Sequence, residues 1–231
     1  MGFGRNIQFL RKLYGKMTQE ELAEKMNVSR QTISRWELEI VFPEMEKAIL
    51  LCKLFSCSLD DLMLKDMAHY DEAYMDIRVE EVPPMRYVKY AVISEEPEGD
   101  AIRHIQDWAM SSGIREPEII GWDFPCLSQE QINVFHMHGY VAACILPEDF
   151  NETNIEIDVQ EKQSYAVITI KEPFSAPFVL IPNAYKTLGY YIEVNGMKGK
   201  REKGMIPCFE KKYEKAGITY MDVYIAIEHC G

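Results

Sequence analysis

The sequence predicts an all-α N-terminal domain followed by an α+β domain built on an antiparallel sheet. Apolar residues recur at helical spacing over the first 65 residues, and from residue 77 onward they alternate as they do in strands. A length of 231 residues is enough for two domains of ordinary size. We therefore expect a helical domain over residues 1–66, a linker over 67–76 and the α+β domain over 77–231.

The charge of the chain is divided unevenly between these two parts. Residues 1–65 carry ten basic and nine acidic side chains, whereas residues 66–231 carry 15 basic and 28 acidic ones, for a formal net charge of -12 overall. An acidic surface repels phosphate, because like charges destabilise one another. The second domain is therefore expected to stay away from nucleic acid and to serve another purpose.

Composition also bears on the compartment and on cofactors. No segment approaches the roughly 20 apolar residues that span a bilayer, and the N-terminus lacks the pattern of a signal peptide, so we expect a cytoplasmic protein with no membrane association. The six cysteines form no CxxC pair, which is typical of reduced, mostly buried thiols. No metal or cofactor is expected.

The first helices are predicted from apolar spacing and from residues typical of helix ends. Residues 7–14 have helical spacing and stop at Gly15. Thr18 and Glu21 form a capping box, in which each side chain accepts from the other residue's backbone N–H. The helix that follows buries a stripe over residues 22–26 and ends at Asn27, a residue that tolerates left-handed backbone.

A third helix begins after Ser29, a favourable N-cap residue. Ile33 and Trp36 lie three residues apart and should face the core. The remaining polar residues of this helix should face outward: Arg30, Gln31, Ser34 and Arg35. A fourth helix is expected near Pro43-Glu44, and a second capping pattern, Ser58 with Asp61, opens a fifth.

Residues 7–63 resemble the helix-turn-helix domain of Xre/Cro/C1-type repressors in the spacing of their buried and capping positions. The resemblance implies that the third helix enters the major groove of double-stranded DNA, with Arg30, Gln31, Ser34 and Arg35 at base edges and with Gln19 and Ser29 at phosphates. One such module buries little DNA surface, so we expect a homodimer on a palindromic operator. The alternative is an ordinary solvated helix face.

The second domain shows one order of elements twice. Strands are predicted over 77–82, 85–93, 118–124 and 140–146, with a helix opening at Pro97, and again over 154–159, 164–171, 205–210 and 221–227, with a helix over 182–194. The second strand of each half carries a similar phrase, YAVIS and YAVIT. Two such halves leave a groove where they join, and an apolar groove with a few polar groups is the usual ligand site.

This duplicated pattern resembles the GyrI-like effector-binding domain, on stretches such as IIGWDFP (119–125), HGYVAA (138–143) and PNAYKTL (182–188). The resemblance implies that Glu210 lies at the floor of an aromatic pocket and meets a cationic or amphipathic small molecule, because a cation relieves the cost of a carboxylate in apolar surroundings. Asp222 is a second acidic candidate. The aromatic candidates for the wall are Trp122, Phe124, Tyr140, Phe174, Tyr190 and Tyr224.

Together these features predict a bacterial one-component transcriptional regulator that is not an enzyme. Two alternatives stay open at this point. Glu210 with Tyr140 could act as base and positioner in a GyrI-like hydrolase of small molecules. The second domain could also be a protein-interaction module without a ligand, in which case it should contain no cavity.

Overall fold

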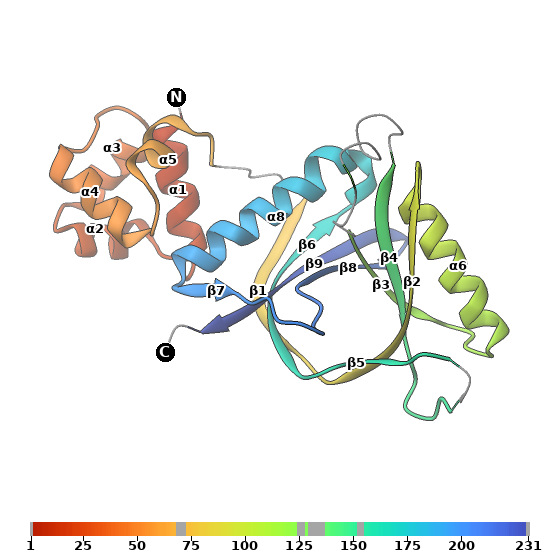
Figure 1. Ribbon diagram of the computed structural model, residues 1–231. Coiled ribbons are helices and arrows are strands. Elements are labelled where there is room, and N and C mark those ends of the chain that lie inside the picture. Colours follow the sequence, from red (N-terminus) through yellow and green to blue (C-terminus); the bar gives the residue numbers. More distant parts are fainter. Residues whose placement is uncertain (1, 68–72, 124–127, 129–136, 152–154, 230–231) are drawn as a thin grey trace. The chain divides into compact units, whose positions relative to one another are not determined.

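The computed structural model describes residues 2–67, 73–123, 128, 137–151 and 155–229 (Figure 1). Its contacts divide the chain into two compact units. The first unit consists of residues 1–75, 176–199 and 227–231. The second unit consists of residues 76–175 and 200–226. Among the described residues no helix is both long enough and apolar enough to cross a bilayer.

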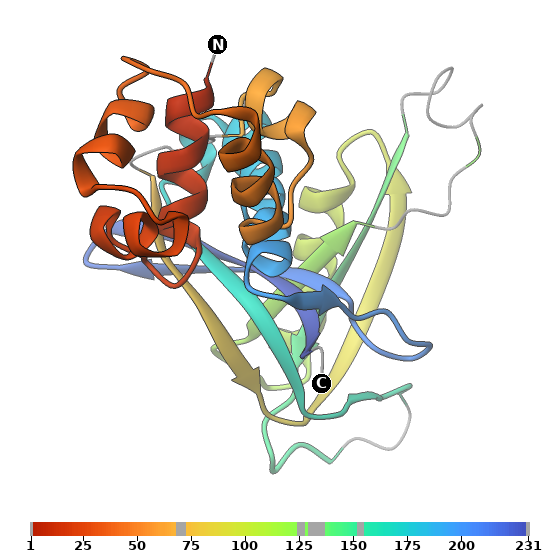
Figure 2. The same cartoon turned by 90° about the vertical axis from the view of Figure 1, so that its left-hand side faces the viewer.

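The first unit holds the predicted helical bundle (Figure 2). Its helices are α1 (Phe3–Leu13), α2 (Gln19–Met26), α3 (Arg30–Glu37), α4 (Met45–Leu54) and α5 (Leu59–Leu64). Both predicted capping boxes are present, Thr18 with Glu21 before α2 and Ser58 with Asp61 before α5. Asn27 ends α2 in the left-handed conformation, at φ 50°. The predicted capping signals are therefore confirmed, whereas α1 begins four residues before its predicted start and Pro43-Glu44 precedes α4 instead of forming its first turn.

Two residues of α1 hold the bundle together. A Cβ atom on Gly4 would lie 2.4 Å from the carbonyl oxygen of Glu37, so only glycine lets α1 approach the end of α3 this closely. Asn6 is fully buried, and its Nδ2 donates to the carbonyl oxygens of Leu62 (3.0 Å) and Lys65 (2.7 Å). These bonds satisfy carbonyl groups that the C-terminal end of α5 leaves unpaired.

The first unit also includes helix α8 (Pro177–Val194) and strand β7 (Met197–Gly199). The helix begins five residues before the predicted start, with Pro177 in its first turn and Pro182, the predicted first residue, within it. The proline removes the hydrogen bond to the carbonyl of residue 178, but Phe178 is 94% exposed, so water can satisfy that group. Within the unit, Asn195 Nδ2 donates to the carbonyl oxygen of Leu13 at 3.1 Å.

The second unit is built on a curled sheet that runs in the order β1-β6-β9-β8-β3-β4-β2-β5 (Figure 1). Helix α6 (Pro97–Ser111) packs against β2 and β4, and a short 3₁₀ helix, η1, covers Pro173–Ser175. The strands are β1 (Tyr74–Val82), β2 (Met85–Ser94), β3 (Glu118–Asp123), β4 (His138–Ile145), β5 (Asp158–Gln160), β6 (Gln163–Lys171), β8 (Cys208–Lys215) and β9 (Ile218–His229).

The predicted α+β class and the duplicated order of elements are confirmed. The two halves exchange their first strands, which the order of elements along the chain does not predict. Strand β1 opens the first half but lies beside β6 of the second half, and β5 opens the second half but pairs with β2 of the first. The halves join where β3 pairs with β8, in register Ile120 with Lys211 and Gly121 with Glu210.

The sheet has two apolar faces, and each strand contributes alternate residues to them. The outer face, under α6, includes Tyr140, Ala142 and Cys144. The inner face, enclosed by the curl of the sheet, includes Ile120, Tyr165, Phe209 and Tyr224. A residue's strand register therefore decides which of two separate environments it enters.

Candidate functional site

Helix α3 presents the predicted polar face. Ile33 is fully buried and Trp36 is 3% exposed, so both anchor the helix in the bundle. Arg30, Gln31 and Arg35 are exposed, and Ser34 is half-buried. This division of the helix into an anchored and an outward face is confirmed, while contact with DNA stays a prediction.

The two residues predicted to contact phosphates both have partners within the bundle. Ser29 caps α3, and its Oγ accepts from the backbone N–H of Thr32 at 3.1 Å. Gln19 Nε2 donates to Glu37 Oε2 at 2.8 Å, and the other oxygen of Glu37 forms an ion pair with Nε of Arg11 at 2.7 Å. The Gln19 side chain thus orders the helix ends, and a phosphate contact from it stays a prediction.

The residues predicted to line one ligand pocket do not lie together. Antiparallel partners share a face of the sheet, so the pairs Gly121–Glu210 and Asp123–Tyr140 place Glu210 and Tyr140 on the outer face. Trp122 lies on the inner face, where its ring is 6.4 Å from that of Tyr87 in an edge-on arrangement.

Three further candidates lie elsewhere. Asp222 and Tyr224 are on the inner face, because they pair with Lys211 and Phe209. Tyr190 lies on α8 in the first unit, where its ring meets that of Phe9 edge-on at 6.2 Å. Phe124 is outside the described residues.

A cavity of about 170 Å³ surrounds Glu210 and Tyr140 on the outer face. The Tyr140 hydroxyl lies 3.4 Å from Oε2 of Glu210 and donates to it. Gly121 lies between them in the sheet, and its missing side chain leaves room for the Tyr140 ring. The wall also contains Glu98 and Ile102 of α6, Phe174 of η1, and Lys212 and Met221.

The electrostatics of this cavity, which we call the Glu210 cavity, are acidic. Burial, followed by the charges of Glu210 and Glu98, raises the pKa of the Tyr140 hydroxyl far above its usual value. Burial also raises the pKa of Glu98, with a further contribution from Asp123, while Lys212 acts in the opposite direction. The Lys212 ammonium lies 5.6 Å from the centre of the Phe174 ring, a cation–π distance.

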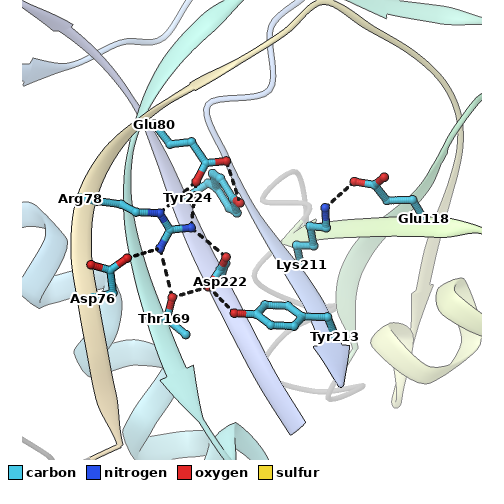
Figure 3. A network of polar contacts seen from close by, with 9 residues as sticks. All are labelled: Asp76, Arg78, Glu80, Glu118, Thr169, Lys211, Tyr213, Asp222 and Tyr224. Atoms are coloured by element: carbon cyan, nitrogen blue, oxygen red, sulfur yellow. Dashed lines mark hydrogen bonds and ion pairs between the residues drawn. The ribbon is translucent and has the colours of Figure 1, made fainter. Parts of the chain in front are cut away.

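Asp222 belongs to a polar network on the inner face, shown in Figure 3. It is 6% exposed, and both carboxylate oxygens have partners. Oδ2 accepts from Arg78 at 3.0 Å, and Oδ1 accepts from Thr169 at 2.5 Å and from Tyr213 at 3.4 Å. Burial disfavours the Arg78 charge, but its hydrogen bonds to Asp222 and Glu80 outweigh this and raise its pKa. This bonding makes Asp222 a structural residue.

Sequence reasoning missed Gly121 and Glu98 and did not assign Lys212 to the cavity. Glu98 lies in the opening turn of a predicted helix, and nothing local shows that this turn reaches the strand that carries Glu210. Two consecutive lysines after Glu210 were visible in the sequence, but only the alternation of β8 decides that Lys212 shares its face.

Among the described residues, no group of His, Cys, Asp or Glu is suited to hold a metal ion.

Comparison with known proteins defines the class of the N-terminal helical segment. Residues 7–62 match the helix-turn-helix family, and this segment is a helix-turn-helix domain. Over 64 residues the chain is 44% identical to the HTH-type transcriptional activator BcrR of Enterococcus faecalis. That match covers 27% of this chain and 30% of the relative.

Solved structures resemble longer parts of the chain at low identity. The EcmrR–DNA complex, determined by cryo-electron microscopy, is similar over 98% of this chain and 82% of its own, with 16% identity and a TM-score of 0.48. SAV2435 bound to tetraphenylphosphonium is similar over 67% of this chain and 94% of its own, with 10% identity and a TM-score of 0.39. A hydrolase from Listeria innocua covers 66% of this chain at 10% identity and a TM-score of 0.41.

Proposed function

We propose that this protein is a transcriptional regulator that binds operator DNA through α3, as a homodimer, and senses a small cationic or amphipathic molecule in the Glu210 cavity. The observation that carries the first half is the exposure of Arg30, Gln31 and Arg35 on a helix anchored by Ile33 and Trp36. Arginine can bond both acceptors of a guanine edge, and glutamine can bond an adenine edge. A single module of this kind buries little DNA surface, which favours a dimer on a palindromic site.

The Glu210 cavity supports the second half. It combines two carboxylates, Glu98 and Glu210, with the rings of Tyr140 and Phe174. A bound cation would relieve the cost of holding the carboxylates together and would contact the aromatic faces. The presence of a cavity also favours sensing over a pure interaction module, in which no cavity is expected.

The size of the cavity limits the ligand. Pockets for drug-sized molecules usually measure about 300–1,000 Å³, and this one measures about 170 Å³. A compact cation is therefore the natural occupant, and a larger one would have to displace a wall residue such as Phe174.

Ligand binding alters DNA affinity only if the ligand prefers one arrangement of the protein. Phe174 precedes the first residue of α8 by three positions, and α8 contacts α1 through the Asn195 bond to Leu13. A ligand that displaces Phe174 would thus act on a helix attached to the DNA-binding bundle. This connection is the route we propose for the signal.

The test of DNA recognition uses operator fragments selected from a random duplex library by the full-length protein. Arg30→Ala, Gln31→Ala and Arg35→Ala should each weaken binding of the selected duplex by about 1–3 kcal/mol, measured by fluorescence anisotropy at fixed salt. Arg103→Ala, which removes a 72%-exposed arginine side chain on α6, is the matched control and should have little effect. Equal losses in all four variants would reduce α3 to a solvated helix face.

The test of sensing uses phenyltrimethylammonium, a compact aromatic cation. Its calorimetric binding should be lost in Glu210→Gln, and its presence should shift the DNA affinity of the wild type but not of that variant. Binding that is unchanged in Glu210→Gln would remove the Glu210 cavity from the proposal and leave the DNA half intact.

A further inference from the structure

The inner face of the second unit contains a larger cavity, of about 320 Å³, which none of the arguments above uses. It lies where the turn between β1 and β2 meets the end of β4 and the strands β3, β8 and β9. The alternation of the strands places it on the opposite side of the sheet from Glu210. It is therefore a separate site, which we call the inner cavity.

The floor of the inner cavity is apolar and buried. Met85, Ile120, Phe209 and Tyr224 line it and are 8%, 1%, 3% and 5% exposed, respectively. The Phe209 and Tyr224 rings stack at 4.2 Å with an interplanar angle of 10°. A floor of this kind favours a flat apolar body, because apolar surface gains free energy when it leaves water.

The rim of the inner cavity is charged and carries more acid than base. It contains three carboxylates, Glu80, Glu118 and Glu148, and two cations, Arg86 and Lys211. Both cations already have partners. Arg86 donates from Nη1 and Nη2 to the carbonyl oxygen of Phe150, each at 3.3 Å, and Lys211 pairs with Glu118 at 2.5 Å (Figure 3). An anionic ligand would have to break these contacts, whereas a cationic ligand can use Oε1 of Glu80, because both Arg78 bonds to Glu80 go to Oε2.

One contact at the rim is longer than a normal bond to a carboxylate. The Tyr224 hydroxyl lies 3.5 Å from Oε1 of Glu80, while Oε2 of Glu80 accepts from Arg78 at 2.8 Å (Figure 3). Hydroxyl donors approach carboxylates at about 2.5–2.7 Å, and charged N–H donors approach them at about 2.7–2.9 Å. Oε1 of Glu80 can thus accept a stronger bond, and the Tyr224 oxygen can accept a second one from the same ligand.

We infer that the inner cavity binds a compact protonated amine, whose apolar ring or short chain lies on Phe209 and Tyr224 and whose ammonium group donates N–H bonds to Glu80 and to the Tyr224 hydroxyl. Glu148 at the rim adds attraction for the same charge. The requirement for N–H donors distinguishes this ligand from a quaternary cation, which offers charge without hydrogen bonds. The inference rests on the inner face alone and does not depend on DNA binding or on Glu210.

The experiment compares phenethylamine with its N,N,N-trimethyl analogue by calorimetry on the full-length Glu210→Gln protein, from which the proposed cation site at Glu210 has been removed. Phenethylamine should bind at least about tenfold more tightly, because the analogue cannot make the charged hydrogen bonds. In the same Glu210→Gln background, Val82→Phe adds a ring at the wall of the inner cavity and should abolish phenethylamine binding.

Two further variants keep the inference falsifiable if Val82→Phe fails to fold. Glu80→Gln retains the shape of the side chain and removes its charge, and should weaken phenethylamine binding about tenfold or more. Glu148→Gln changes an exposed side chain, and should weaken binding by a smaller factor. The inference is overturned if, in the Glu210→Gln background, phenethylamine does not bind, if the trimethyl analogue binds as tightly, or if Glu80→Gln has no effect.

Discussion

Gly121 and Tyr140 occupy the outer face of the sheet so closely that a Cβ atom on Gly121 would lie 2.2 Å from the Tyr140 hydroxyl oxygen. The Tyr140 ring therefore lies over the backbone of β3 and reaches the Glu210 carboxylate. A glycine in a strand often marks such a close approach of a neighbouring group. Here it permits the contact between the aromatic wall and the acidic floor of the Glu210 cavity.

Replacing this glycine should damage the cavity specifically. Gly121→Ala forces the Tyr140 ring to move, which should lower the free energy of unfolding by about 1–3 kcal/mol and weaken the binding of phenyltrimethylammonium. Urea unfolding and calorimetry measure the two effects. Gly99→Ala on α6, where an added Cβ has no neighbour within 4 Å, is the control and should not lower the stability. If neither variant loses stability or cation binding, the Tyr140 ring can move without damage to the Glu210 cavity.

The raised pKa of Glu98 predicts a pH dependence of cation binding. Burial and the nearby Asp123 raise this pKa above the ordinary value of 4.5. Because a cation favours the ionised carboxylate, affinity for phenyltrimethylammonium should fall as the pH decreases through the raised pKa, and this fall should begin above pH 4.5. Glu98→Gln should remove the dependence. Identical pH profiles in both proteins would show that Glu98 does not contact the ligand.

The same shift has a consequence for stability. A carboxyl group whose pKa is raised by folding stabilises the protein below its unfolded pKa, and this stability is lost as the pH rises through the folded pKa. The free energy of unfolding of the wild type should therefore fall relative to that of Glu98→Gln as the pH rises through this window. Urea unfolding at several pH values measures the difference.

Asp222 should matter for stability and not for cation binding at Glu210. Asp222→Ala removes the buried partner of Arg78, Thr169 and Tyr213, and should cost about 2–3 kcal/mol, since Arg78 retains its bonds to Glu80. Binding of phenyltrimethylammonium should be unchanged, because Asp222 lies on the inner face. Thermal unfolding and calorimetry of the same variant separate the two. A loss of binding with intact folding would restore Asp222 as a ligand contact.

The ion pair between Arg11 and Glu37 should be essential for the helical bundle. Their side chains are 9% and 4% exposed, so Glu37→Ala leaves a buried arginine without its carboxylate and should cost about 3–5 kcal/mol. The control is Glu81→Ala, which breaks a pair whose side chains are about 60% exposed and should cost less than about 1 kcal/mol. Comparable losses in the two variants would mean that water or Gln19 replaces the missing carboxylate.

Much of the first unit was predictable from the sequence because its signals are local. Thr18, Asn27 and Ser29 each act on backbone groups within a few residues, and the Ile33–Trp36 spacing orients α3 whatever surrounds it. The contribution of Gln19 to the Glu37 ion pair was not predictable, because that contact joins residues 18 positions apart. The order of the strands and of α6 in the second unit also followed from local periodicity, whereas α8 of the first unit begins five residues before its predicted start.

The sequence by itself determined the two kinds of secondary structure, the outward face of α3 and the duplicated order of strands, because hydrophobic period and helix capping act over short distances. Only the tertiary structure decided that Glu210 meets Tyr140 and Glu98, while Asp222 and Tyr224 lie on the other face and Tyr190 in the other unit. The physical reason is register. A shift of one residue between paired strands moves every side chain to the opposite face, and the alternation within one strand contains no information about its partner.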